Sequence, residues 1–278
     1  MIAESQPDTI TSPADDTNPN GVFHWKLWVY TNFDCNLRCA YCVAESSPAA
    51  PRRALGAETI RQIVDEAVAL GFQEVFFTGG EPFLLDDIYE TLAYAAARLK
   101  TTVLTNGMLM KGARLERLRG VAHPNLTVQV SLDGGRAEHH DAYRGAGTWI
   151  KTVKGIRALQ AAGFHVRLGT TETPANSDHL GELAEFRHAL GIPAADHFVR
   201  PLARRGFADE GAEVSAATLV PEVTVTAGGV YWHPLASPSS DDLLVSTEIF
   251  PLAAAVARIQ EQLAAPAQGQ PTERACFT

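Results

Sequence analysis

The sequence is poor in cysteine, in basic residues and in long apolar runs. Only four cysteines occur among 278 residues, which is too few for a disulfide-based fold. Lys and Arg number 23 against 32 Asp and Glu, and the net charge of −9 argues against a general nucleic-acid binder. No apolar run reaches membrane-spanning length, and the N-terminus lacks the basic, apolar pattern of a secretory signal. We therefore expect a cytoplasmic protein that binds neither nucleic acid nor membrane.

What the sequence does contain is a regular alternation of strand-like and helix-like segments. Apolar residues make up 46% of the chain, enough for a sizeable core. Residues 1–20 carry three prolines and no sustained apolar pattern, which predicts a disordered tail. The strand-like segments are 22–31, 74–78, 101–105, 126–132, 165–171 and 197–202. Gly71, Gly163 and Gly191 each follow a helix-like segment, where a C-terminal cap favours glycine.

Strands that alternate with helices form a parallel sheet with right-handed crossovers. Six units are two fewer than a closed eight-stranded barrel, so we predict an α/β fold with a partial (β/α)6 TIM-like barrel over 21–215. The polar face of 126–133 indicates a ligand- or solvent-filled lumen, although an antiparallel strand with one wet face has the same alternation. Residues 216–278 break the rhythm, and a hairpin plus a helix predict a small C-terminal extension.

Three of the cysteines fall within eight residues, just after the first predicted strand. Cys35, Cys39 and Cys42 have the spacing C-x3-C-x2-C. Thiolates bind zinc or iron–sulfur clusters, and a closed site uses four ligands. The triplet alone therefore fits two sites: a [4Fe–4S] cluster with one open iron, or a zinc site completed by His24 or Cys276.

Further motifs stand at the ends of the next predicted strands. They are Gly79-Gly80-Glu81-Pro82, Asn106-Gly107 and Ser131-Leu132-Asp133-Gly134, followed by Arg144. Together with the triplet and Tyr41, this ordered set resembles the radical S-adenosylmethionine (SAM) superfamily, and in particular its SPASM or twitch subfamily, over about residues 24–235. The resemblance implies one [4Fe–4S] cluster on the three cysteines, with SAM chelating the open iron. Reductive cleavage of SAM would then yield a 5′-deoxyadenosyl radical that abstracts hydrogen from the substrate.

The resemblance also assigns roles to residues around SAM. Glu81, with Gly79 and Gly80, would hold the methionine amino group, while Ser131 and Arg144 would contact the ribose or the carboxylate. The remaining predicted cofactor residues are Tyr41, near the adenine, and Pro82, Asn106 and Asp133. One more residue separates Ser131 from Arg144 than in related sequences, and Asn106 and Asp133 also suit a turn and a loop cap. For the neighbouring segment 139–141 (His-His-Asp) we expect a solvated helix start rather than a second metal site.

The C-terminal segment lacks the cysteines that SPASM and twitch extensions use for auxiliary clusters. Beyond the triplet only Cys276 remains, and one thiolate cannot hold a cluster. We therefore expect a degenerate extension over 216–278, no auxiliary cluster, and a stray thiol at Cys276. Candidate substrate contacts are Trp28, Gln129, Arg167 and Arg200 on the predicted inner face, and Tyr231 and Trp232 in the hairpin. His233 is a candidate for catalytic proton exchange.

The resemblance favours a substrate that is a ribosomally made peptide, modified by cross-linking, epimerisation or oxidation. The alternative is a small metabolite, such as an aminosugar or nucleoside intermediate, that is dehydrogenated, decarboxylated or rearranged. Either reaction needs an electron donor such as flavodoxin or ferredoxin.

Overall fold

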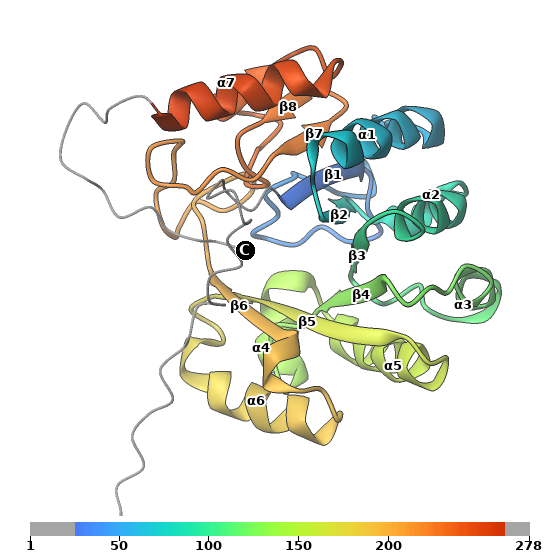
Figure 1. The fold of residues 1–278 in the computed structure, drawn as a ribbon. Helices are drawn as coiled ribbons and strands as arrows, with labels where there is room; N and C mark the ends of the chain where they lie inside the picture. The colour runs from blue at the N-terminus through green and yellow to red at the C-terminus, as the bar shows by residue number, and fades with distance from the viewer. Residues whose placement is uncertain (1–25, 265–278) are drawn as a thin grey trace, which may run out of the picture.

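A computed structural model describes residues 26–264, so the predicted tail at 1–20, His24 and Cys276 lie outside the described residues. Six parallel strands occur where the sequence predicts them. They are β1 (Lys26–Asn32), β2 (Glu74–Gly79), β3 (Lys100–Thr105), β4 (Leu126–Ser131), β5 (His165–Glu172) and β6 (His197–Pro201). Each pairs with its neighbour in chain order. The sheet is curved and does not close, which confirms the partial-barrel prediction (Figure 1).

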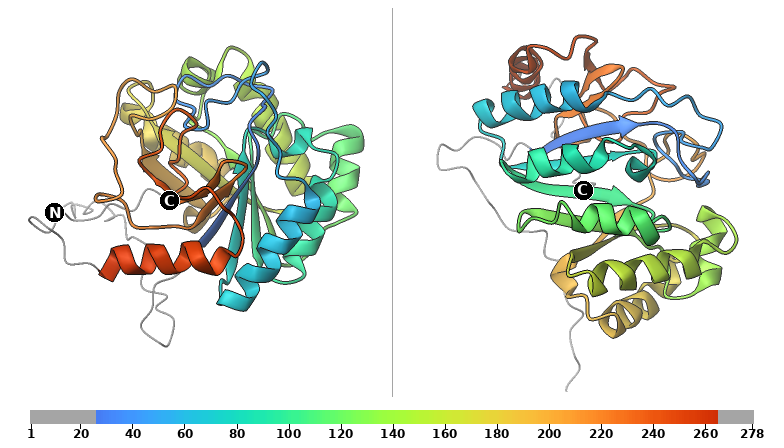
Figure 2. Two further views of the ribbon diagram at one scale, coloured as in Figure 1. Left: turned by 90° about the horizontal axis from the view of Figure 1, so that it is seen from above. Right: turned by 90° about the vertical axis from the view of Figure 1, so that its right-hand side faces the viewer.

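Helices connect the strands and cover the outer face of the sheet (Figures 1 and 2). They are α1 (Ala57–Leu70), α2 (Ile88–Ala96), α3 (Gly112–Arg119), α4 (Ala137–Arg144), α5 (Thr148–Ala161) and α6 (Leu180–Ala189). Short 3-10 turns stand at η1 (Pro82–Leu84), η2 (Ser177–His179) and η3 (Ala194–Asp196). The glycines predicted to end helices, Gly71, Gly163 and Gly191, have φ of +90°, +85° and +72°, a conformation that glycine adopts without strain. No helix in the described part of the chain is both long and apolar enough to cross a membrane.

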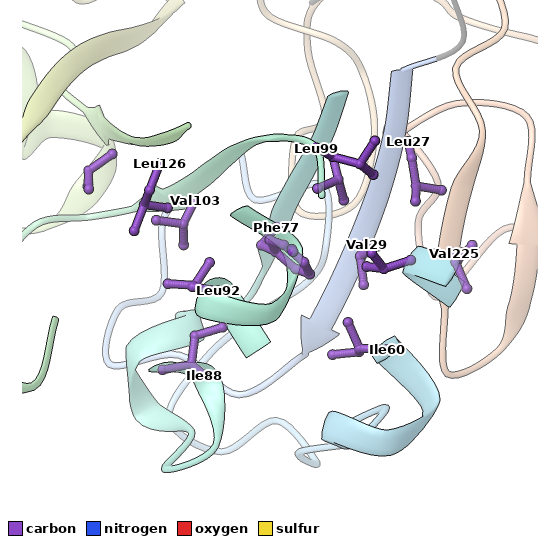
Figure 3. Close-up of a cluster of buried hydrophobic side chains, with 14 of the residues drawn as sticks. Leu27, Val29, Ile60, Phe77, Ile88, Leu92, Leu99, Val103, Leu126 and Val225 are labelled. Atoms are coloured by element: carbon purple, nitrogen blue, oxygen red, sulfur yellow. The ribbon is translucent and has the colours of Figure 1, made fainter. Parts of the chain in front are cut away.

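The hydrophobic core lies between these helices and the outer face of the sheet. Ile60 of α1 and Leu92 of α2 face Val29 and Phe77 of the strands (Figure 3). All four are at most 3% exposed, and each contributes roughly 1.5–3 kcal/mol through burial. Because the helices bury one face of the sheet, the opposite face and the carboxyl ends of the strands remain available for a site.

The C-terminal extension continues the same sheet. β7 (Thr224–Thr226) pairs in parallel with β1, and β8 (Gly229–Tyr231) forms the predicted hairpin with it. A third strand, β9 (Leu244–Ser246), was not predicted; it spans three residues that show no clear alternation. The predicted final helix is α7 (Leu252–Ala264), and its Leu252 amide donates a 2.6 Å hydrogen bond to Glu66 on α1. The boundary near 216 stays a prediction, since one sheet runs across it.

Candidate functional site

A single pocket at the carboxyl ends of the strands collects most of the predicted site residues. From the cysteine loop and the strand ends, its lining includes Cys35, Cys39, Tyr41, Cys42, Gly79, Gly80, Asn106, Ser131 and Arg144. Loop residues 201–203 after β6 and residues 233–235 of the extension line it as well. Motifs from four separate stretches of sequence therefore meet in one cavity, as expected for a site at the carboxyl ends of parallel strands.

The three cysteines lie on the loop between β1 and α1. Burial, as the largest cause, raises the pKa of Cys35 to about 12 and that of Cys39 to about 11. Such thiols keep their protons at neutral pH unless a cation displaces them, as iron does. Backbone amides already point at two of the sulfurs, from Leu37 to Cys35 at 3.4 Å and from Ser46 to Cys42 at 3.3 Å. Three soft donors in one pocket fit an iron–sulfur cluster that keeps one iron open.

Gly79 and Gly80 let two backbone segments meet beneath the pocket. A Cβ on Gly79 would lie 2.2 Å from the Asn32 carbonyl oxygen, and one on Gly80 would lie 2.0 Å from that of Asp34. The Gly80 amide donates a 2.8 Å hydrogen bond to the Asn32 carbonyl. Glycine is therefore required at both positions because β2 contacts the start of the cysteine loop there. This requirement holds whether or not a ligand also approaches the backbone of these glycines.

Glu81 is fully buried and lies below the pocket rather than in its lining. Its carboxylate accepts hydrogen bonds from the Thr105 hydroxyl (2.9 and 3.0 Å) and from the backbone amides of Asn106 (3.0 Å) and Phe83 (3.2 Å). Burial raises the pKa of Glu81 to about 7, although these donors oppose the shift. In this conformation the carboxylate joins the ends of β2 and β3. Pro82, at the start of η1, is buried beside it.

Asp133 joins two pocket residues that the sequence left unconnected. Its carboxylate accepts from Arg144 Nε at 2.6 Å, from the Tyr41 hydroxyl at 2.5 Å and from the Thr171 amide at 3.0 Å. The Arg144 guanidinium lies 5.3 Å from the centre of the Tyr41 ring. Arg144 and hydrogen bonding outweigh burial and lower the pKa of Asp133, so the pair is ionised. Asp133 thus fixes Arg144 and Tyr41 at the pocket wall without lining the pocket itself.

Asn106 connects β3 to the cysteine loop. Its side-chain amide donates to Asn36 at 2.8 Å, and its side-chain oxygen accepts from the Met108 amide at 3.0 Å. It therefore occupies the pocket lining and also stabilises a turn. Asn36 was not among the predicted site residues. Three residues that line the pocket, Thr78, Leu104 and Thr171, were also not predicted. They stand at strand ends on the same face of the sheet as Ser131, and this position is the signal that could have identified them.

The predicted substrate contacts separate into two groups. Trp28, Arg200 and His233 line the pocket. His233 is 1% exposed; burial, reinforced by Arg200, lowers its pKa to about 3, and Nδ1 accepts from the Leu235 amide at 3.1 Å. It is therefore neutral at physiological pH, which suits a hydrogen-bonding role better than an acid one.

The second group lies away from the pocket. Gln129 pairs in register with Arg167, but the pocket is lined further along these strands, at Ser131 and Thr171, because neighbouring strands are staggered. Arg167 instead lies 3.8 Å from Asp196 and 4.2 Å from the centre of the Phe198 ring. In the hairpin, Tyr231 and Trp232 pack into the core, and the Trp232 indole donates to the Leu219 carbonyl at 3.1 Å.

The helix start at His139-His140-Asp141 is not solvated as predicted. His139 is 8% exposed and His140 is fully buried. His140 Nδ1 accepts a hydrogen bond from the Asp133 amide at 3.1 Å. Asp141 accepts from the amides of Gly147 (2.6 Å) and Trp149 (2.8 Å). The segment is buried because its side chains accept hydrogen bonds from the Asp133 loop and from the start of α5.

Two later segments hold the cysteine loop in place. A Cβ on Gly206 would lie 2.3 Å from the Cys42 carbonyl oxygen, and the next amide, of Phe207, donates to that oxygen at 3.1 Å. Arg205, which is 8% exposed, pairs with Asp242 of the extension. Glu45 of the cysteine loop accepts from the Ser237 hydroxyl at 2.5 Å. Sequence reasoning did not identify these contacts, which join residues far apart in the chain.

The partial parallel barrel brings three cysteines and the glycine-rich end of β2 to one pocket, an arrangement that suits a metal cluster beside a second ligand. Comparison with known proteins identifies the class more closely. A sequence profile of the radical SAM superfamily matches residues 29–186. The chain belongs to this superfamily, with homologues in the SPASM/twitch-type maturase group. Family membership supports SAM and an iron–sulfur cluster as its cofactors.

Individual relatives differ in what they make. The chain is 32% identical over 203 residues to an AdoMet-dependent heme synthase of Methanosarcina barkeri, covering 72% of this chain and 56% of the relative. It is 36% identical over 165 residues to the antilisterial bacteriocin subtilosin biosynthesis protein AlbA of Bacillus subtilis, covering 58% and 36%. The mycofactocin maturase MftC of Mycolicibacterium smegmatis is 32% identical over 182 residues, covering 65% and 45%. The chain thus spans about half the length, or less, of these curated relatives.

The fold is shared with solved structures. The crystal structure of Streptococcus suis SuiB bound to S-adenosylmethionine matches with a TM-score of 0.59 at 23% identity, covering 70% of this chain and 45% of SuiB. Native anSMEcpe with bound AdoMet matches with a TM-score of 0.59 at 14% identity, covering 76% and 74%.

Proposed function

We propose that this chain is a radical SAM enzyme that modifies a ribosomally made peptide by cross-linking, epimerisation or oxidation. The observation that carries the chemistry is the convergence of Cys35, Cys39 and Cys42 on one pocket with Arg144 and the glycine-rich end of β2. The peptide substrate rests on the similarity to the bacteriocin biosynthesis protein AlbA and the maturase MftC. The three cysteines would hold one [4Fe–4S] cluster beside SAM, and with an electron from a flavodoxin or ferredoxin these cofactors would supply 5′-deoxyadenosyl radical chemistry.

The protein's own groups position and shield the reactants. The Arg144 guanidinium, oriented by Asp133, offers donors to the carboxylate or ribose of SAM, with Ser131 on the neighbouring strand end. Tyr41, held by the same carboxylate, borders the adenine region. On the extension side of the pocket, Trp28 and Arg200 are the proposed substrate contacts. Asp133 balances the charge of Arg144, and none of the described lining residues carries a carboxylate, so Arg200 suits an anionic substrate group.

The extension serves this site as a support, in our proposal, without an auxiliary cluster. Its residues 233–235 form one side of the pocket, and Ser237 binds the cysteine loop through Glu45. These contacts give the extension a positioning role at the site.

A small-metabolite substrate is the second candidate. It is favoured by the 32% identity to an AdoMet-dependent heme synthase, a relative whose named product is not a peptide.

The core chemistry is tested by anaerobic reconstitution with iron and sulfide, followed by reductant and SAM. We expect about four irons per chain and formation of 5′-deoxyadenosine, both lost in Cys39→Ala. One zinc per chain without SAM cleavage would contradict the proposal. The substrate is tested with peptides encoded beside the gene: transfer of deuterium from a labelled peptide into 5′-deoxyadenosine supports the first candidate, and transfer only from a small metabolite supports the second.

A further inference from the structure

Three side chains of types that can ligate a metal lie outside the pocket, where α4 meets η2 and α6. They are His139 on α4, His179 at the end of η2 and Glu182 on α6. One donor atom from each lies within 4.8 Å of the other two. The pocket and its cysteines use none of these residues.

Two atoms of this group are buried without a hydrogen-bond partner among the described residues. They are His139 Nδ1 and Glu182 Oε1. His139 is 8% exposed, and its Nδ1 faces Glu182 Oε1 across 3.8 Å, which is too long for a hydrogen bond. A buried nitrogen and a buried carboxylate oxygen are costly to leave without a partner, and a cation between them would satisfy both when the proton of His139 is on Nε2.

The surrounding charges orient both atoms. Arg136 Nε holds the other carboxylate oxygen, Glu182 Oε2, at 3.0 Å and leaves Oε1 directed at His139. On the far side of the imidazole, His139 Nε2 lies 3.5 Å from the Glu138 carboxylate. A carboxylate behind a histidine places the proton on the far nitrogen and leaves the near one free to bind a metal. His179 stacks on His139 with ring centres 3.9 Å apart and is itself exposed.

We propose that His139, His179 and Glu182 bind one divalent transition-metal ion, best suited to Zn²⁺. Two imidazoles and a carboxylate are a common zinc donor set, with water in the fourth position. Zinc bonds of about 2.0–2.1 Å place tetrahedral ligands about 3.4 Å apart, and the ion lies near the plane of each imidazole. Binding therefore requires the exposed His179 to leave its stack on His139 and turn its ring toward the ion.

The ion connects α4 to η2 and to the first turn of α6. These segments also hold the pocket, since His140 accepts from the Asp133 amide and the Asn176 side chain donates to the Asp133 carbonyl at 2.8 Å. The metal therefore braces the loop that orients Arg144, in a role independent of the substrate.

The test measures metal content of the full chain after its cluster has been reconstituted, so that the cysteines are occupied. The holoenzyme is dialysed against buffered micromolar free Zn²⁺, and zinc and iron are determined by mass spectrometry. We expect one zinc per chain beside about four irons, and at least a fivefold loss of zinc in His179→Ala and Glu182→Gln at unchanged iron.

His188→Ala is the matched control, because His188 is an exposed histidine on α6, the helix that carries Glu182. We expect this variant to retain its zinc. His179 is exposed, so its substitution leaves the fold intact, as circular dichroism verifies. Absence of zinc from the wild-type holoenzyme, or retention of zinc in His179→Ala, overturns the proposal. Neither result bears on SAM cleavage, which the cysteine variants test separately.

Discussion

Arg144 donates a 2.6 Å hydrogen bond from Nε to Asp133 Oδ2, and both side chains are buried at the wall of the cofactor pocket. The residues are eleven positions apart, on the loop after β4 and at the end of α4. The pair connects the geometry of the barrel to the geometry of the pocket, because Asp133 also binds Tyr41 and the Thr171 amide of β5.

Replacing Asp133 with Asn removes the charge that compensates Arg144. Because breaking a buried ion pair leaves the partner charge uncompensated, we expect a loss of about 3–5 kcal/mol in the free energy of unfolding. We also expect weaker SAM binding, since Arg144 and Tyr41 lose their orientation. Anaerobic denaturant titration and equilibrium dialysis with SAM measure the two effects. Asp178→Asn, at an exposed position, is the control and should change neither; equal stability of Asp133→Asn and wild type would contradict the prediction.

His233 provides a prediction about pH. Its pKa is about 3 in the folded chain against an ordinary value of 6.5, so the unfolded chain binds an additional proton between these values. Stability from this residue is fully present above pH 6.5 and is lost as the pH falls toward 3. Between pH 7.5 and 5.5 the contribution falls by about 1.4 kcal/mol.

In His233→Asn this loss should disappear, and in the control His188→Asn it should persist. Comparison of unfolding free energies at the two pH values isolates the effect from other titrating groups. The same shift predicts that turnover shows no titration of His233 near pH 6.5. An inflection there that vanishes in His233→Asn would show that the residue exchanges a proton in the reaction.

The sequence predicts the barrel well because its strands and helices have regular periods. Segments 101–105 and 126–132 lie almost where β3 and β4 form, whereas β9 is too short to show a period. Residues at strand ends, such as Ser131, could be placed near a cofactor by motif. Gln129 could not be excluded, because the stagger between strands decides which residues of one face reach the pocket. Contacts such as Glu45 with Ser237 join residues 192 positions apart and leave no local pattern.

Gly206→Ala tests the support of the cysteine loop. Gly206 has a φ of +61°, and a Cβ there would overlap the carbonyl groups of Cys42 and Val43. We expect the loop to shift and the iron content after reconstitution to fall from about four to fewer than two per chain. Gly181→Ala is the matched control, since a Cβ at Gly181 meets nothing within 4 Å. Normal iron content and SAM cleavage in Gly206→Ala would show that the loop tolerates this displacement.

Arg200→Gln tests whether the substrate carries an anionic group. Arg200 lines the pocket, and the one hydrogen bond described for its Nε is a 3.4 Å contact to the Thr171 hydroxyl. Hydrogen bonds to a charged partner contribute roughly 1.5–3 kcal/mol, so the KM for substrate should rise about 10–100-fold. The Kd for SAM should change less than about twofold, because Arg144 serves the cofactor. Arg204→Gln removes a neighbouring exposed charge outside the pocket lining and should leave both constants unchanged. Steady-state kinetics with the identified substrate and dialysis with SAM separate the outcomes: a weakened Kd for SAM at constant KM would assign Arg200 to the carboxylate of the cofactor instead.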